Sequence, residues 1–127
     1  METNRKLIYF VEDDQFMVRM YKRLFLLNNF ELETAFNGEE AISNLQNIKQ
    51  KPDIIILDIM MPKLDGFEVL KFLKKNTQLK DVPVAILTNL SGKENAERAL
   101  NMGAAFYFMK SQYLPKEIIE KIKEIVE

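Results

Sequence analysis

The stretch that decides the fold runs Lys51-Pro52-Asp53-Ile54-Ile55-Ile56-Leu57-Asp58-Ile59-Met60-Met61-Pro62-Lys63-Leu64-Asp65-Gly66. Its four consecutive apolar residues, 54–57, predict a strand that is buried on both faces. Asp58 comes next, where that strand ends. Pro62 keeps the residue before it out of the helical region, and Asp65-Gly66 adds a second turn signal. The stretch therefore predicts a buried strand that presents one acid, held in a stiff loop, at its carboxyl end.

Composition excludes several classes of protein. The chain has 127 residues, which is the usual size of one domain, and we expect a single domain over residues 1–127 with no output domain. It contains no cysteine and no histidine, so disulfides, thiolate chemistry, imidazole metal sites and a histidine phosphodonor within the chain are excluded. The net charge is −1, which gives no basic footprint for nucleic acid. No apolar run is long enough to span a membrane, so we expect a cytoplasmic protein.

The rest of the chain alternates short apolar runs with segments of helical spacing. Strands are predicted at 7–11, 30–36, 54–57, 84–87 and 105–109, and the second of these alternates in polarity as an edge strand does. A helix is predicted after each strand. Alternation of this kind favours parallel strands joined by right-handed crossovers, with helices on both faces of the sheet. The fold class is therefore α/β, a single doubly wound five-stranded parallel sheet.

Three helices carry details that the structure can test. We expect the first helix to begin after Asp14 and to bury the stripe Phe16, Met20, Leu24 and Leu27. Asp65 has N-cap spacing before the third helix. Ser91 and Glu94 form a Ser-x-x-Glu pattern that predicts a capping box for the fourth. That fourth helix is poor in apolar residues up to its expected end near Gly103.

Polar residues follow most of the predicted strands. Glu12-Asp13, Asp58, Thr88 and Lys110 stand at four carboxyl ends, which meet at one edge of a parallel sheet, where ligands bind in open α/β folds. Crowded carboxylates need a cation, and oxygen ligands with no histidine or cysteine favour Mg²⁺. A carboxylate nucleophile, a metal, a lysine and a hydroxyl together indicate phosphoryl transfer onto an aspartate.

These motifs resemble the receiver domain of two-component response regulators, most of all the single-domain chemotaxis type. The residues that carry the resemblance are Glu12-Asp13, Leu57-Asp58, Met61-Pro62, Asp65-Gly66, Leu87-Thr88 and the segment from Tyr107 to Lys110. The resemblance covers essentially the whole chain, with the motifs in the family's order and spacing. It implies a flavodoxin-like (βα)5 fold with strand order 2-1-3-4-5.

The resemblance also implies a role for each site residue. Asp58 is then the phosphoacceptor, and Mg²⁺ is bound by Asp13, by Glu12 directly or through water, by Asp58 and by the Met60 carbonyl. Thr88 and Lys110 hold the phosphoryl oxygens. Tyr107 matches the aromatic switch position, which turns inward as the threonine moves. The chain departs from the family pattern at Ser111, where proline usually follows a cis peptide bond, and the sequence leaves the isomer at Lys110–Ser111 open.

Two functions follow from these expectations. The first is a signalling switch that takes a phosphoryl group from a histidine kinase or phosphotransfer protein. It would catalyse its own phosphorylation and dephosphorylation and would act on no separate substrate. Phosphorylation would then change the surface of the fourth helix, fifth strand and fifth helix for an unknown protein target, as a monomer or a phosphorylation-linked dimer. The alternative is a protein-binding module that keeps the fold without being phosphorylated.

Overall fold

The computed structural model describes residues 5–127, and residues 1–4 of the predicted domain lie outside this part. Its elements are β1 (Leu7–Val11), α1 (Gln15–Leu27), β2 (Glu31–Ala35), α2 (Gly38–Gln46), β3 (Ile54–Leu57), α3 (Gly66–Lys75), β4 (Val84–Thr88), α4 (Lys93–Asn101), β5 (Phe106–Met109), the short 3₁₀ helix η1 (Lys110–Gln112) and α5 (Pro115–Val126). The five strands form one parallel sheet in the order β2-β1-β3-β4-β5, as predicted. None of the described helices is both long and apolar enough to cross a membrane.

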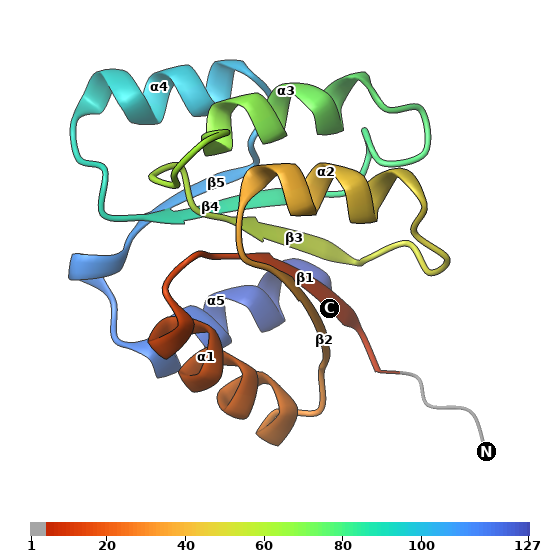
Figure 1. Ribbon diagram of the computed structural model, residues 1–127. Helices are drawn as coiled ribbons and strands as arrows, with labels where there is room; N and C mark the ends of the chain where they lie inside the picture. The colour runs from red at the N-terminus through yellow and green to blue at the C-terminus, as the bar shows by residue number, and fades with distance from the viewer. Residues whose placement is uncertain (1–4) are drawn as a thin grey trace.

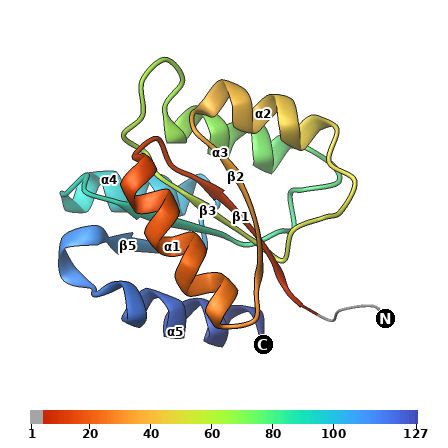
Figure 2. The same ribbon diagram turned by 60° about the horizontal axis from the view of Figure 1, so that its bottom comes forward.

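The sheet is sandwiched between two layers of helices (Figures 1 and 2). Alternate residues of β3 point into two separate cores: Ile55 and Leu57 pack with α2, α3 and α4, whereas Ile54 and Ile56 pack with α1 and α5. All four residues are at most 1% exposed. A strand covered on both faces must be apolar throughout, which is why this run carries no polar alternation.

The first helix buries a different face from the predicted one. Val18, Tyr21 and Phe25 face the sheet, whereas Phe16 is 80% and Leu27 75% exposed. The predicted inner stripe is therefore wrong for Phe16, Met20 and Leu27, whereas Leu24 is partly buried against the core. Tyr21 packs edge-on against Phe10 of β1 and Phe25 packs edge-on against Phe30, so aromatic contacts fix the orientation of the helix.

Side-chain caps begin three of the helices. Asp14 accepts from the Phe16 and Met17 N–H groups, Asn37 from the Glu40 N–H, and Asp65 from the Glu68 N–H. The capping box predicted at Ser91 and Glu94 is absent. Gly92 occupies the N-cap of α4 at φ 108°, a backbone conformation open to glycine, so the N-cap lies one residue past the serine and the helix begins at Lys93.

The fourth helix has few buried contacts, as its composition predicts. Ala99 is its one buried residue, and Leu100 is 44% exposed. A second contact comes from Arg98, whose guanidinium lies over the ring of Phe67 in α3, 3.8 Å from the ring centroid. The helix ends at Asn101 with Met102 as its C-cap, and Gly103 follows with φ 108°, close to the predicted end. So thin an attachment is typical of an element with low local stability.

Helix α3 begins with a side-chain cap and α4 begins without one, so substitutions at the two starts should change the free energy of unfolding by different amounts. Asp65→Ala removes the acceptor for the Glu68 N–H and should lower the free energy of unfolding by about 1 kcal/mol. Ser91→Ala is the matched control, because the serine side chain caps nothing, and it should change stability by less than about 0.5 kcal/mol. Urea unfolding measures both. Equal losses would show that Ser91 caps α4 in solution.

Candidate functional site

Four neighbouring strands deliver the predicted polar residues to one edge of the sheet. Glu12 and Asp13 follow β1, Asp58 follows β3, Thr88 ends β4 and Lys110 follows β5. Glu12 and Thr88 are completely buried and Asp58 is 3% exposed, whereas Asp13 is open to solvent. The residues that the sequence predicts as one site therefore do lie together, with Asp13 on its solvent side.

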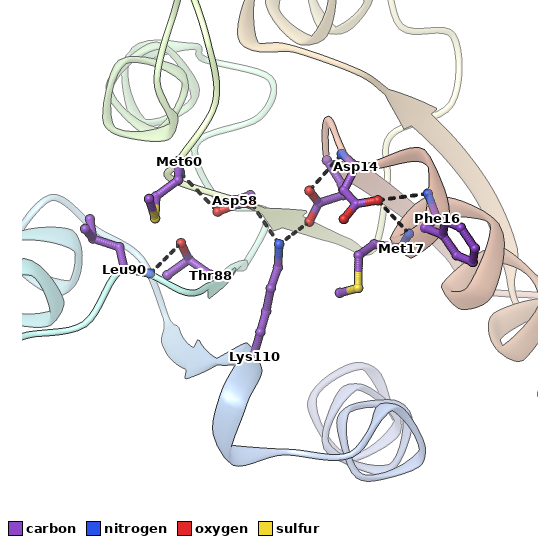
Figure 3. Close-up of polar contacts among 9 residues, drawn as sticks. Asp14, Phe16, Met17, Asp58, Met60, Thr88, Leu90 and Lys110 are labelled. Carbon is purple, nitrogen blue, oxygen red and sulfur yellow. Dashed lines mark hydrogen bonds and ion pairs between the residues drawn. The ribbon is translucent and has the colours of Figure 1, made fainter.

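The ammonium group of Lys110 bridges two of the carboxylates. Its Nζ lies 2.6 Å from Glu12 Oε1 and 2.9 Å from Asp58 Oδ2 (Figure 3). Glu12 also accepts a hydrogen bond from the Asp14 N–H at 3.1 Å through its other oxygen. Two buried acids of like charge repel one another, and this lysine offsets the repulsion.

The loop after β3 fixes the orientation of Asp58. The Asp58 N–H donates to the Val11 carbonyl of β1, and Asp58 Oδ1 accepts from the Met60 N–H at 3.0 Å. The loop then folds back so closely that a Cβ at Gly66 would lie 2.3 Å from the Asp58 carbonyl oxygen. Glycine is required there because any side chain would displace the backbone that carries the acid.

The three acids form a group that fits a hard divalent cation. Glu12, Asp13 and Asp58 each offer one carboxylate oxygen, and these oxygens lie within 4.8 Å of one another. When all three carboxylates are ionised, the one ammonium group of Lys110 leaves two negative charges uncompensated. Oxygen ligands with no thiolate or imidazole suit Mg²⁺, which keeps several of its own waters. The exposed Asp13 leaves the group open to solvent, so a hydrated ion could reach it.

A second set of hydrogen bonds joins Thr88 to Tyr107 through the backbone of Leu90. The Leu90 N–H donates to Thr88 Oγ1 at 3.2 Å, and the Tyr107 hydroxyl donates to the Leu90 carbonyl at 2.7 Å. Burial and then the charge of Asp58 raise the pKa of Tyr107, so the phenol keeps its proton. A change in the hydroxyl of Thr88 can therefore reach Tyr107 through the backbone of one residue, Leu90.

Burial sets the protonation of the carboxylates in this pocket. Burial, assisted by the charge of Asp58, raises the pKa of Glu12 to about 7, although Lys110 opposes the shift. For Lys110, burial disfavours the charge, but the ion pairs with Glu12 and Asp58 outweigh it and raise the pKa above 10.5. The lysine therefore stays charged, and Glu12 titrates near neutral pH.

The structure places the other predicted residues at the rim of the pocket. The Met60 side chain is 54% exposed, and its N–H is the group that contacts Asp58. No peptide bond among residues 5–127 is cis, so the bond between Lys110 and Ser111 is trans. Sequence reasoning missed the link through Leu90, since it is made by backbone atoms that no side-chain pattern reports.

The titration of Glu12 predicts a pH dependence of stability. Its folded-state pKa of about 7 is above the ordinary value of 4.5, so between these values the folded chain holds a proton that the unfolded chain has released. The stabilisation is complete below about pH 4.5 and is lost as the pH rises through about 7.

We therefore expect the metal-free wild type to lose unfolding free energy over this interval more steeply than Glu12→Gln. Urea titrations at a series of pH values measure the two slopes. Parallel slopes would contradict the raised pKa.

Comparison with known proteins agrees with this geometry. The family profile described as the response regulator receiver domain matches residues 8–123. The chain is 34% identical over 126 residues to the probable transcriptional regulator ycf27 of Cyanophora paradoxa, covering 99% of this chain and 50% of that protein. It is 31% identical over 118 residues to the polar-differentiation response regulator DivK of Brucella anthropi, covering 93% and 94%.

Solved structures give the same result. The phosphorylated cyanobacterial phytochrome response regulator RcpA superposes with a TM-score of 0.86 at 28% identity, over 96% of this chain and 94% of that one. The chain spans about half the length of ycf27 and of the other transcriptional regulators like it. The matched family, the shared strand order and the acidic pocket lead to one conclusion: this chain belongs to the response regulator receiver domains of two-component systems.

Proposed function

We propose that the chain is a phosphorylation-dependent signalling switch whose phosphoacceptor is Asp58. The observation that carries the proposal is the convergence of one buried carboxylate with two further acids and a lysine. The phosphodonor would be the phosphohistidine of a histidine kinase or phosphotransfer protein. The alternative, a binding module that is never phosphorylated, uses the same fold but has no need for buried acids of like charge.

The residues of the pocket suggest how the transfer proceeds. An oxygen of Asp58 attacks phosphorus, the P–O bond forms as the P–N bond breaks, and the electron pair of that bond leaves with the imidazole. Both oxygens of Asp58 already accept hydrogen bonds, from Met60 and Lys110, which hold the carboxylate in place. Lys110 can then move from the carboxylate to a phosphoryl oxygen, because its stem is flexible.

A divalent ion would be held by Glu12, Asp13 and Asp58 together with the carbonyl of Met60. Bound Mg²⁺ supplies charge neutralisation on the transferred group. Lys110 supplies part of the same stabilisation from the other side, and the rigid loop before Gly66 supplies positioning. In this proposal the protein catalyses its own phosphorylation and hydrolysis and acts on no other substrate.

The proposed response uses the link between Thr88 and Tyr107. The Thr88 hydroxyl accepts a hydrogen bond from the Leu90 N–H. When this hydroxyl turns to donate to a phosphoryl oxygen, it would pull the backbone at Leu90 with it. The Leu90 carbonyl is held by the Tyr107 hydroxyl, so the tyrosine must follow or release it. The thinly attached α4 lies directly after this segment, and the surface of α4, β5 and α5 would then repack to bind a downstream protein.

Phosphorylation itself is tested with Mg²⁺ and acetyl phosphate, read by intact mass. Wild type should gain one phosphoryl group, and chelating the metal should prevent the gain. Asp58→Asn should gain none, because the nucleophile is lost. The matched control is Asp14→Asn, which alters a neighbouring acid but keeps a residue able to cap α1. A wild type that gains nothing would favour the binding module.

The response is tested by amide hydrogen exchange with and without acetyl phosphate. Exchange should change in α4, β5 and α5 of the wild type, whereas α2, on the opposite edge of the sheet, should be unaffected (Figure 1). Asp58→Asn treated in the same way is the control and should show no change. Identical exchange in the two states of the wild type would refute the proposed switch surface.

A further inference from the structure

Met60 presents a thioether to solvent beside the acidic pocket. Its side chain is 54% exposed, more than that of any other methionine among residues 5–127, while its N–H donates to Asp58. Met61, its neighbour in the same loop, is 9% exposed. A peroxide must reach the sulfur to oxidise it, and oxidation turns a flexible apolar side chain into a polar one. Met60 is therefore the described methionine that is most accessible to a small oxidant.

Arg98 of α4 lines a hollow of about 480 Å³ together with Met60. Leu90 lines it too, and the Met60 side chain lies on the Leu90 side of Asp58 (Figure 3). Within the described chain, Arg98 is the one residue of this lining whose side chain carries hydrogen-bond donors. The rest are apolar or thioether side chains and the Asp65 carboxylate. The thioether of Met60 is only a weak acceptor for those donors.

The donors of Arg98 are available for a new hydrogen bond. The face of the guanidinium lies over the ring of Phe67, 3.8 Å from its centroid, and such stacking leaves the N–H groups in the guanidinium plane unused. Among residues 5–127, no ion pair or hydrogen bond engages these groups. The Asp65 carboxylate in the same hollow accepts from the Glu68 N–H instead. An acceptor placed at Met60 would therefore meet unused donors.

We propose that Met60 is a site of reversible oxidation, and that its sulfoxide binds Arg98 and so joins α4 to the loop after β3. In the reaction the sulfur lone pair attacks one oxygen of hydrogen peroxide, and the S–O bond forms as the O–O bond breaks. The departing hydroxide takes the proton of the transferred oxygen and becomes water. Sulfur is oxidised and the peroxide is reduced. Methionine sulfoxide reductases restore the thioether.

The sulfoxide changes the attachment of α4. Its oxygen carries partial negative charge, and hydrogen bonds from a charged donor such as a guanidinium are stronger than neutral ones. The bond is compatible with stacking on Phe67, because it uses the edge of the guanidinium and not its face. Ala99 is the one buried residue of α4, so a single added bond is a large gain in local stability. This proposal goes beyond the phosphoryl switch and does not depend on it, although both act on α4.

The first measurement is the rate at which each methionine gains an oxygen atom. The full-length chain without phosphorylation is treated with millimolar hydrogen peroxide, and peptide mapping by mass spectrometry resolves the methionines. Met60 should be oxidised at least about tenfold faster than Met61, its buried neighbour and matched control. Oxidation of Met61 or Met102 as fast as Met60 would overturn the assignment of the site.

The second measurement is amide hydrogen exchange in α4 before and after oxidation. Exchange should slow at least about threefold when Met60 is oxidised, and it should recover when the reductases for both sulfoxide epimers are added. Met60→Leu should show no slowing after the same treatment, which excludes an effect of Met102 at the C-cap of α4. Arg98→Leu should still be oxidised at Met60 but should show no slowing, because it lacks the donors.

Lys93→Leu is the matched control for Arg98→Leu, because Lys93 is an exposed cation of the same helix that does not line the hollow. It should keep the slowing seen in the wild type. No phosphodonor and no metal is added at any step, so the outcome is separate from that of the switch test. Unchanged exchange after oxidation, slowing in Met60→Leu, or equal slowing in Arg98→Leu would each overturn the proposal.

Discussion

The repulsion between buried carboxylates is the constraint on which the arrangement of this pocket depends. Glu12 and Asp58 are both removed from water, and a pair of like charges in such a place is strongly unfavourable without a counter-charge. Lys110 supplies one, at ion-pair distance from both acids. Lys110 follows β5 at one edge of the sheet, whereas Glu12 follows β1, so the site depends on four adjacent strands of the sheet.

One lysine does not neutralise three acids, and the remaining negative charge gives the pocket its chemistry. Burial is the main cause of the raised pKa of Glu12, and the charge of Asp58 adds to it against the attraction of Lys110. A cation bound from solution would reduce the repulsion among the three carboxylates. In the proposed switch, a dianionic phosphoryl group would approach only when positive charge is already present, so metal binding and phosphoryl transfer would be linked through the electrostatics of the pocket.

Much of the fold could be predicted from the sequence because its signals are local. The run Ile54 to Leu57 is too apolar for anything but a doubly covered strand, and the acid after it must then lie at a strand end. Parallel topology brings such ends together whatever lies between them, so the convergence of Asp58 with Lys110 followed from element order alone.

The orientation of α1 could not be predicted in the same way, because the helix carries two apolar stripes. Phe16 and Met20 form one stripe, and Val18, Tyr21 and Phe25 form the other. Arg19 and Arg23 share the face of Phe16 at spacings of three and seven, and burying that face would bury two guanidinium groups. That signal was present in the sequence and decides the orientation.

The start of α4 depended on backbone conformation. The positive φ of Gly92 fixes where the helix begins. The spacing between Ser91 and Glu94 in the sequence carries no information about this dihedral angle.

The stacking of Arg98 on Phe67 has a mechanical consequence for α4. A guanidinium 3.8 Å from the centroid of an aromatic ring is attracted to the face of the ring as a whole, so the contact has no single direction as a hydrogen bond does. Small lateral displacements keep most of the attraction. The contact thus allows α4 to shift sideways across α3 while the two helices remain associated.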